Sequence, residues 1–282
     1  MSKRSGNDVF TAGEAKAKGY TVQNVMKDDF GFEIPVEIVP LPSKGRVYPV
    51  DHPLHGKDTV QIRAMTAREE DILTSKALIK KGTVISELLR SCLIDKAIDP
   101  EGMLTGDRNA VMVALRITGY GAEYNTEVNC PACNSRVKNE FNLGTLPIKG
   151  LDTAPVAEGS NLFEFELPRS KATVRYRLLT GSDERELGQI SERQKKQGSI
   201  ADSLVTNRFG FALVSVNGIT DKGKIKHFIR NMPAMDSRKL RKHMDAAEPG
   251  IDMKSFIECP SCGETSEVRM PLGANFFWPD SE

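Results

Sequence analysis

Two short stretches, Cys130-Pro131-Ala132-Cys133-Asn134 and Cys259-Pro260-Ser261-Cys262-Gly263, repeat one pattern in the two halves of the chain. Each is a Cys-Pro-x-Cys turn followed by a residue that tolerates a positive φ, asparagine in the first and glycine in the second. Such a turn directs two thiolates at one point, and two turns together supply the four sulfurs of a tetrahedral metal site. The sequence therefore predicts that the turns meet around one zinc ion. Its ligands would be Cys130, Cys133, Cys259 and Cys262.

An internal repeat relates the two segments that carry these turns. From residue 107 onward, one constant offset pairs Asp107 with Asp236 and Leu143 with Leu272, and the same offset relates the two Cys turns. The matched segments further upstream are residues 41–44 with 167–171, 60–66 with 174–180, 69–70 with 183–184, 81–84 with 197–200, and Leu88 with Leu204. A tandem duplication explains this shared order of matches. One copy supplies two thiolates, too few for a closed site, so the zinc would clamp the copies together.

The repeat divides the chain into five parts. They are a flexible N-terminal arm (1–32), a first repeat with the first Cys hairpin (33–145), a linker rich in glycine and proline (146–161), a second repeat with the second Cys hairpin (162–275), and an aromatic and acidic C-terminal tail (276–282). Each repeat would contain an opening hairpin, two or three helices and a Cys hairpin. The predicted fold class is α+β, with two pseudo-symmetric repeats joined by a zinc-ribbon-like tetrathiolate site.

Local signals place several elements of the first repeat. Residues 33–42 alternate apolar and polar side chains but carry three prolines, which favours an edge strand or an extended arm. Thr66-Ala67-Arg68-Glu69 has the pattern of a capping box, and a helix is expected from there to about Lys80. A second helix is expected over residues 84–97. Cys92 lies on its apolar face and is interpreted as a buried hydrophobic residue rather than a ligand.

Composition excludes several classes of function. The chain of 282 residues is 39% hydrophobic and 27% charged, with a net charge of +1, so its overall charge favours neither nucleic acid nor an anionic membrane. No apolar run is long enough to span a bilayer, and the first residues lack the apolar core of a secretion signal. Four of the five cysteines lie in Cys-x-x-Cys pairs, which in a reducing compartment favours metal or redox chemistry over structural disulfides.

Other motifs give weaker indications. Residues 218–224 spell most of a P-loop, but Ile225 follows where magnesium coordination requires serine or threonine. His52 and His55 lie near two aspartates and could form a weak metal site, although a solvated loop is the preferred interpretation. The basic run over residues 222–242 is interpreted as a solvated face of two amphipathic helices, with RNA or DNA contact as the alternative. The sequence contains no G-x-S-x-G motif and no convincing carboxylate pair, so we expect no enzymatic activity.

A set of motifs carries a family resemblance. The motifs are Leu41-Pro42-Ser43-Lys44-Gly45 with Tyr48, the run Arg63-Ala64-Met65-Thr66-Ala67-Arg68-Glu69-Glu70-Asp71-Ile72-Leu73, Gly106-Asp107-Arg108, Tyr120-Gly121-Ala122-Glu123-Tyr124, and Cys130-Pro131-Ala132-Cys133. Together they resemble the baseplate hub and hub-assembly protein family of T-even-type contractile-tailed phages. The resemblance is clearest over residues 40–145 and weaker in the second repeat.

The resemblance implies a non-enzymatic role in building a tail baseplate. The implied partners are other baseplate hub, wedge or tail-tube proteins, with no small-molecule substrate and no membrane. The implied location is the host cytoplasm during assembly, with the virion tail baseplate as a second location. We expect partner contacts from the N-terminal arm, the proline-rich strand and the aromatic residues 276–278. For the aromatic residues, packing back onto the second repeat is the alternative. Two alternatives stay open, a zinc-ribbon nucleic-acid-binding protein and a dithiol oxidoreductase, and iron could replace zinc in the site.

Overall fold

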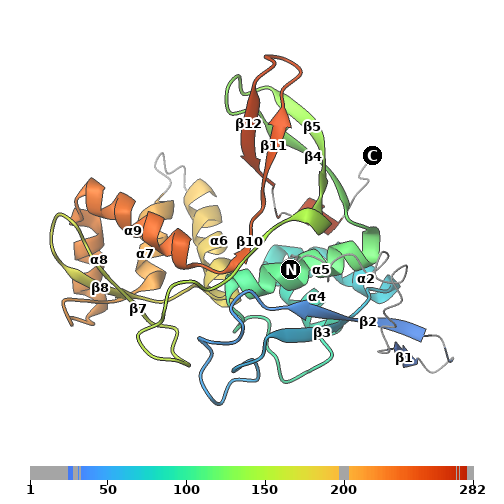
Figure 1. Cartoon of the computed structure of the whole chain (residues 1–282), viewed down its shortest axis with the longest axis horizontal. Coiled ribbons are helices and arrows are strands. Elements are labelled where there is room, and N and C mark those ends of the chain that lie inside the picture. Colours follow the sequence, from blue (N-terminus) through green and yellow to red (C-terminus); the bar gives the residue numbers. More distant parts are fainter. Residues whose placement is uncertain are drawn as a thin grey trace, which may run out of the picture.

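The computed structural model describes residues 25–27, 31, 33–196, 203–270, 272 and 274–277 of the chain. Two mixed α/β lobes lie side by side, and a stalk made of two β-hairpins stands above them (Figure 1). The expected mixture of helices and strands is therefore confirmed. Of the N-terminal arm predicted over residues 1–32, the structure describes Val25–Lys27 and Gly31, and the remainder lies outside the described residues.

The first lobe is a small sheet with helices packed on it. Its strands follow the order β1-β2-β3, and α5 contacts β2. The elements of this lobe are β1 (Val25–Lys27), β2 (Glu33–Pro40), β3 (Thr59–Arg63), α2 (Ala67–Thr74), α3 (Lys76–Lys81), α4 (Val84–Cys92) and α5 (Thr105–Tyr120).

The second lobe also combines one sheet with helices. Its strands follow the order β7-β8-β9, and α8 contacts β9. The elements of this lobe are β7 (Phe163–Glu166), β8 (Thr173–Tyr176), α6 (Gly181–Lys196), α7 (Leu204–Ala212), β9 (Leu213–Val216), α8 (Lys222–Asn231) and α9 (Ala234–Ala247).

The stalk takes one hairpin from each half of the chain. Its strands are β4 (Glu123–Asn129), β5 (Arg136–Asn142), β11 (Lys254–Glu258) and β12 (Thr265–Arg269). Below it, β6 (Ile148–Lys149), which follows the first hairpin, pairs with β10 (Gly250–Ile251), which precedes the second. The remaining elements are the short 3-10 helices η2 (Leu143–Thr145) and η3 (Ala274–Phe277).

One buried motif begins a helix in each lobe. In the first lobe, Glu69 accepts hydrogen bonds from the Thr66 N–H at 2.9 Å and from its hydroxyl at 2.7 Å, and it forms a bidentate pair with Arg63 at 2.6 and 3.0 Å. The capping box predicted from the sequence is thus confirmed. The same arrangement begins α6, with distances of 2.7–2.9 Å, among Arg177, Thr180 and Asp183.

A buried carboxylate near the start of α5 holds the loop that joins β2 to β3. Asp107 accepts hydrogen bonds from the Ser43 N–H at 2.9 Å, the Ser43 hydroxyl at 2.5 Å and the Tyr48 hydroxyl at 2.8 Å. The Tyr48 hydroxyl in turn accepts from the N–H of Leu104 at 2.9 Å. Burial raises the pKa of Asp107, and the hydrogen bonds from Ser43 and Tyr48 offset only part of this effect.

Asp236 near the start of α9 makes a corresponding contact in the second lobe. It accepts hydrogen bonds from the N–H groups of Arg169 at 2.8 Å and Ser170 at 2.9 Å, in the turn that joins β7 to β8. Both turns contain a lysine with a positive φ, 52° at Lys44 and 59° at Lys171. Burial alone raises the pKa of Asp236, but hydrogen bonds from Arg169 and Ser170 and the positive charge of Arg169 together hold its pKa below the ordinary value.

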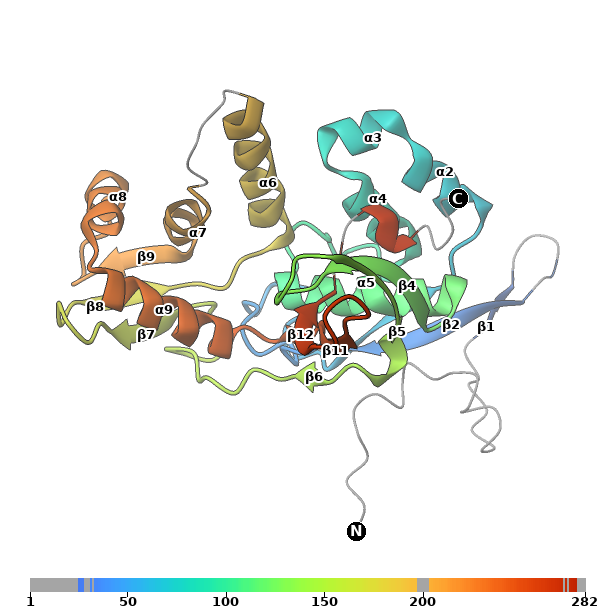
Figure 2. The same cartoon turned by 90° about the horizontal axis from the view of Figure 1, so that it is seen from above.

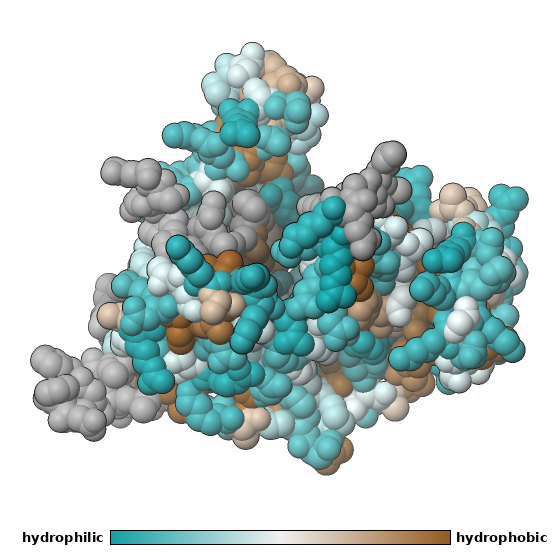
Figure 3. Space-filling view, turned by 180° about the vertical axis from the view of Figure 1, so that it is seen from behind, coloured by the Kyte–Doolittle hydropathy of each residue, from teal (hydrophilic) through white to brown (hydrophobic). Residues whose placement is uncertain are grey.

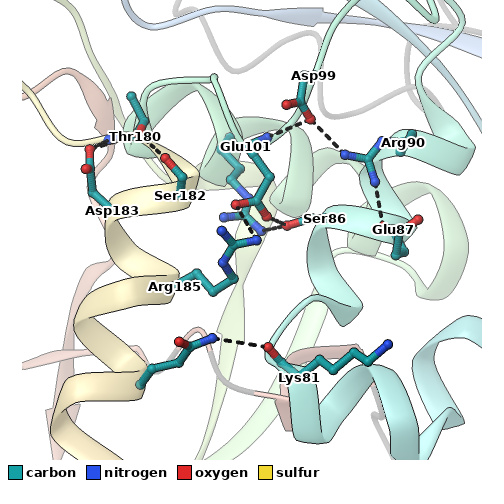
Figure 4. Close-up of polar contacts among 12 residues, drawn as sticks. Lys81, Ser86, Glu87, Arg90, Asp99, Glu101, Thr180, Ser182, Asp183 and Arg185 are labelled. Atoms are coloured by element: carbon teal, nitrogen blue, oxygen red, sulfur yellow. Dashed lines mark hydrogen bonds and ion pairs between the residues drawn. The ribbon is translucent and has the colours of Figure 1, made fainter.

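The lobes contact each other directly, apart from the stalk. Leu104 and Thr180 form an antiparallel bridge between them. A side chain is excluded at Gly106, because a Cβ there would lie 1.7 Å from the carbonyl oxygen of Pro249. Figure 4 shows the polar contacts of this junction: Arg185 of α6 pairs with Glu101 of the first lobe at 3.2 Å, beside Ser86 of α4.

The segment after the second hairpin returns to the first lobe. Figure 2 shows η3 lying over α5 and beside α4. The buried Arg116 of α5 donates from Nε to the Phe276 carbonyl at 3.0 Å, and the Phe276 ring makes an edge contact with Tyr124. Phe276 and Phe277 are fully buried, so the expectation that they contact a partner protein is wrong. Trp278 and the rest of the tail lie outside the described residues.

Three local expectations need correction. The proline-rich strand β2 lies between two neighbours, because residues 33–35 pair with β1 and residues 36–40 pair with β3, so it is not a simple edge strand. The helix expected over residues 66–80 breaks at Ser75, which adopts an extended conformation between α2 and α3. The helix expected to reach Ala97 ends at Cys92, because Leu93 forms a bridge with Ile62 of β3.

Two further expectations of the sequence are confirmed. Cys92 is fully buried, and its burial raises the pKa of the thiol to about 12, as expected of a cysteine that serves as a small hydrophobic residue. Within the described part of the chain, no helix has the length and apolar character needed to cross a membrane.

Candidate metal centre

The two Cys turns have the same backbone conformation. In each, the N–H of the first cysteine donates to the carbonyl of the residue five positions later, and the residue four positions later donates back to that cysteine's carbonyl. The distances are 2.9 and 2.8 Å in the first turn and 3.0 and 2.8 Å in the second. The residue behind each turn has a positive φ, 59° at Asn134 and 72° at Gly263, as its type predicted.

Matching strand registers bring the turns to the same end of the stalk. The last pair of β4 and β5 joins Asn129 to Arg136, and the last pair of β11 and β12 joins Glu258 to Thr265, each directly before its turn. The two hairpins stand side by side in both views (Figures 1 and 2). Nearest the turns, their buried apolar side chains belong to one continuous core and are Val128, Val137, Ile257 and Val268. Packing through these residues sets the turns against each other.

The four sulfurs form one compact group. All four Sγ atoms lie within 4.8 Å of one another. The Sγ atoms of Cys130 and Cys262 are 3.9 Å apart, and those of Cys133 and Cys259 are 3.6 Å apart. A tetrahedral ion with metal–sulfur bonds of about 2.3 Å requires sulfur separations of about 3.8 Å. The donor set therefore fits a metal ion held by two cysteines from each half of the chain.

Ser135 is a polar neighbour of the sulfurs that the sequence did not predict. Its hydroxyl oxygen lies 3.0 Å from Cys133 Sγ and 3.3 Å from Cys259 Sγ. This contact lowers the pKa of Cys133, and with backbone N–H groups it lowers the pKa of Cys259 to about 6. The N–H of Glu264 acts in the same direction on Cys262, but the adjacent thiols raise its pKa to about 12. Metal binding would therefore release protons from this group.

The location of the turns argues against thioredoxin-like chemistry. Both lie at the tips of hairpins, between β4 and β5 and between β11 and β12. A reactive Cys-x-x-Cys dithiol is commonly activated at a helix N-terminus, where the helix dipole stabilises the thiolate. Neither turn precedes a helix, so the geometry favours metal binding over redox exchange.

The other motifs do not form sites of comparable quality. Among the described residues, the cysteines are the one group of three or more His, Cys, Asp or Glu side chains placed to share an ion. His52 Nδ1 accepts from the Leu54 N–H at 3.1 Å, and His55 Nδ1 lies 2.6 Å from the Tyr48 carbonyl, so both are used locally. The P-loop-like segment contains Asp221, whose carboxylate caps α8 where a phosphate would bind.

Comparison with known proteins relates one part of the chain to a known family. Residues 41–162 match the family model described as T4 bacteriophage base plate protein. This match supports a T4-type phage baseplate protein and confirms the resemblance carried by the motifs of the first repeat. It covers most of the first lobe, the first Cys hairpin and the linker, while the second lobe lies outside it. No curated protein and no solved structure matches the chain.

Proposed function

We propose that this protein is a structural and assembly component of a contractile phage tail baseplate hub. It acts through protein–protein contacts, and a structural zinc ion fixes its two pseudo-symmetric repeats. The observation that carries the proposal is the four-sulfur cluster, to which each half of the chain contributes one Cys turn. The match of residues 41–162 to a baseplate family supplies the context. No catalytic role is assigned to any residue. The other hub, wedge and tail-tube proteins of the baseplate are the proposed partners.

Several paired features support the duplication on which this proposal rests. Helices α5 and α9 begin at Thr105 and Ala234, which the constant offset of the repeat relates, and the two Cys hairpins follow at the same offset. The buried arginine–acid motif begins a helix in both lobes. The boundaries that we propose for the units are 33–145 and 162–275, joined by the linker 146–161. A pseudo-two-fold arrangement of these units explains why each brings half of the metal ligands.

The zinc ion is not the only link that we assign between the two halves of the chain. The lobes already contact each other at the Leu104–Thr180 bridge and the Glu101–Arg185 pair. The Cys turns lie at the tips of the two hairpins that make up the stalk, beyond the last strand pairs. The ion therefore fixes the stalk as one rigid projection. Four thiolates also suit iron, and measurement of the metal content distinguishes the two.

Metal analysis tests the site directly. Purified protein should contain one zinc ion per chain by inductively coupled plasma mass spectrometry, and Cys259→Ser should lose it. Cys92→Ala is the matched control, because Cys92 is a buried cysteine away from the cluster. Two zinc ions per chain, or full retention of metal in Cys259→Ser, would contradict the proposed site. Iron in place of zinc would overturn the identity of the metal alone.

The assembly role requires a separate experiment. A phage lacking this gene product should yield incomplete baseplates in electron micrographs of infected-cell lysates, and supplying the chain in trans should restore complete tails. Quantitative mass spectrometry of purified virions then separates a permanent tail component from a factor that acts only in the host cytoplasm. Normal tails in the absence of the chain would refute the assembly role while leaving the zinc site untouched.

A further inference from the structure

The second lobe carries an apolar groove between α7 and α9, and none of the metal-ligand cysteines lines it. Its floor includes Leu178 and Phe209, and its wall on α7 is formed by Leu204 and Val205, which are 54% and 36% exposed. The cavity has a volume of about 140 Å³. An apolar cavity of about this size accommodates one benzene ring. The groove is therefore large enough for a single aromatic side chain.

The corresponding surface of the first lobe shows how such a face is covered. The constant offset between the repeats relates Arg116 of α5 to Asp245 of α9, and Asp245 lines the groove. Arg116 is covered by η3, whose Phe276 ring is fully buried. In the second lobe the segment after the first hairpin forms β6 instead and pairs with β10. The aromatic segment η3 thus covers the face around Arg116 in the first lobe, while the corresponding groove of the second lobe is open.

Unpaired cations border the groove on α9. Arg241 lines it together with the acidic Asp245 and Glu248. Arg238 lies three residues before Arg241 and four before Lys242, on the same side of the helix. Within the described residues, none of the three forms an ion pair, whereas Arg208 on α7 contacts Glu184 and Glu248. The rear face of the molecule is mostly hydrophilic, with apolar residues in small separate areas (Figure 3). The groove thus combines an apolar lining with bordering cations that form no ion pair among the described residues, which is the chemistry of a docking surface.

We propose that this groove binds a short segment of a neighbouring protein in which an aromatic side chain is followed by carboxylates. The aromatic ring fills the cavity against Phe209, and the carboxylates face Arg238 and Arg241. The inference rests on the proposed assembly function, since it identifies the kind of partner segment that the baseplate supplies. The chain itself contains a segment of this chemistry, Phe276-Phe277-Trp278-Pro279-Asp280-Ser281-Glu282, which provides a practical probe.

Fluorescence anisotropy with the full chain tests the groove. The probe is a fluorescein-labelled synthetic peptide of residues 274–282. We expect saturable binding that Val205→Asp weakens at least tenfold, because the carboxylate enters the apolar wall. Val214→Asp is the matched control, since Val214 on β9 is 37% exposed and does not line the groove. Arg241→Glu should weaken binding several-fold, while Lys239→Glu, on an exposed residue outside the groove, should not.

A photocrosslinking measurement keeps the test independent of variant folding. A peptide carrying benzoylphenylalanine in place of Phe277 should crosslink to α7 or α9 of the wild-type protein. Absence of saturable binding, equal loss in Val205→Asp and Val214→Asp, or crosslinks confined to the face around Arg116 would overturn the proposal. Tight, salt-sensitive binding of a DNA oligonucleotide that depends on Arg241, with no peptide binding, would assign the surface to nucleic acid instead. Peptide binding without any baseplate defect in phage lacking the chain would refute the assembly role alone.

Discussion

Asp107 and Asp236 occupy corresponding positions near the starts of α5 and α9, yet their surroundings shift their pKa values in opposite directions. Asp107 accepts hydrogen bonds from the loop between β2 and β3, and Asp236 accepts them from the turn between β7 and β8. In the first lobe that connection is longer, and its Tyr48 closes over the carboxylate. The pKa of Asp107 is raised by burial, whereas hydrogen bonds from Arg169 and Ser170 and the positive charge of Arg169 hold the pKa of Asp236 below its ordinary value. An aspartate near the start of a helix thus holds a long loop with Tyr48 in the first lobe and a short turn in the second lobe.

The difference extends to the surfaces that the lobes leave free. The first lobe is enclosed by the loop bearing Tyr48, by the second lobe at Gly106 and by η3. In the second lobe, the position that corresponds to Gly106 is Met235, which is 56% exposed. The first lobe is therefore the structural centre of the molecule. The second lobe leaves exposed an apolar groove and, among the described residues, several cations of α9 that form no ion pair.

The largest effect is expected at the cluster, where the two halves should behave alike. Cys130→Ser and Cys259→Ser each remove one buried thiolate from a four-ligand set. Both variants should lose stoichiometric metal, because three thiolates do not complete a tetrahedral structural site. Zinc content and thermal unfolding of each variant check this. If one variant retained a full equivalent of metal, the two halves would not contribute equally.

Replacing the two aspartates should separate the lobes energetically. Asp107→Ala leaves the buried Ser43 and Tyr48 donors without an acceptor, and we expect a loss of about 3–5 kcal/mol in unfolding free energy. Asp236→Ala leaves two backbone N–H groups and should cost about 1–3 kcal/mol. Urea titration measures both. Equal losses of unfolding free energy in the two variants would show that the hydrogen bond from Tyr48 adds no stability to the first lobe.

A glycine-to-alanine change probes the lobe junction. In Gly106→Ala the new Cβ meets the Pro249 carbonyl, so the lobes must shift apart, at a cost of about 2–4 kcal/mol. Met235→Ala at the corresponding exposed position should change stability by less than about 0.5 kcal/mol. Differential scanning calorimetry of both variants provides the comparison. A neutral Gly106→Ala would mean that the contact between the lobes yields easily.

The smallest effect concerns the arginine–acid motifs and depends on pH. Burial alone raises the pKa of Glu69, but hydrogen bonds from Arg63 and its other donors lower it to about 2. Because this folded pKa lies below the unfolded value, the stabilisation is complete above about pH 5 and is lost as pH falls towards 2. Glu69→Gln should therefore cost about 1–3 kcal/mol at pH 7 and much less near pH 2.

Asp183→Asn serves as the comparison in the second lobe. Its effect should follow the same direction with pH but be smaller, because the Arg177 side chain is 31% exposed, against 16% for Arg63. Chemical denaturation of both variants across the pH range gives the two profiles. A cost for Glu69→Gln that stays constant down to pH 2 would rule out the ionised carboxylate as its source.

Features set by adjacent residues could be predicted from the sequence. The positive φ at Asn134 and Gly263 and the capping box at Thr66 depend on a few neighbouring positions. The four-sulfur cluster was also predictable, although its halves lie far apart, because a tetrahedral site needs four ligands and each turn offers two. A motif that supplies only half of the ligands of a metal site thus indicates, from a single sequence, that a distant motif completes it.

Features set by tertiary packing could not be predicted in this way. Leu88 and Leu204, which the repeat pairs, differ in position and burial: Leu88 lies four residues after the start of α4 and is buried, whereas Leu204 begins α7 and is exposed. Sparse identities within amphipathic helices do not fix the alignment. The contact of Ser135 with Cys259 had no signal either, because it joins hairpins from opposite halves of the chain.

The path of the C-terminal segment sets the order in which the molecule can be completed. Arg116 is buried in α5, and one of its hydrogen-bond acceptors, the carbonyl of Phe276, follows 160 residues later. During synthesis the first lobe leaves the ribosome early, but the face around Arg116 stays uncovered until the segment around Phe276 has emerged. The lobe that is made first is therefore completed only after the second lobe has been made.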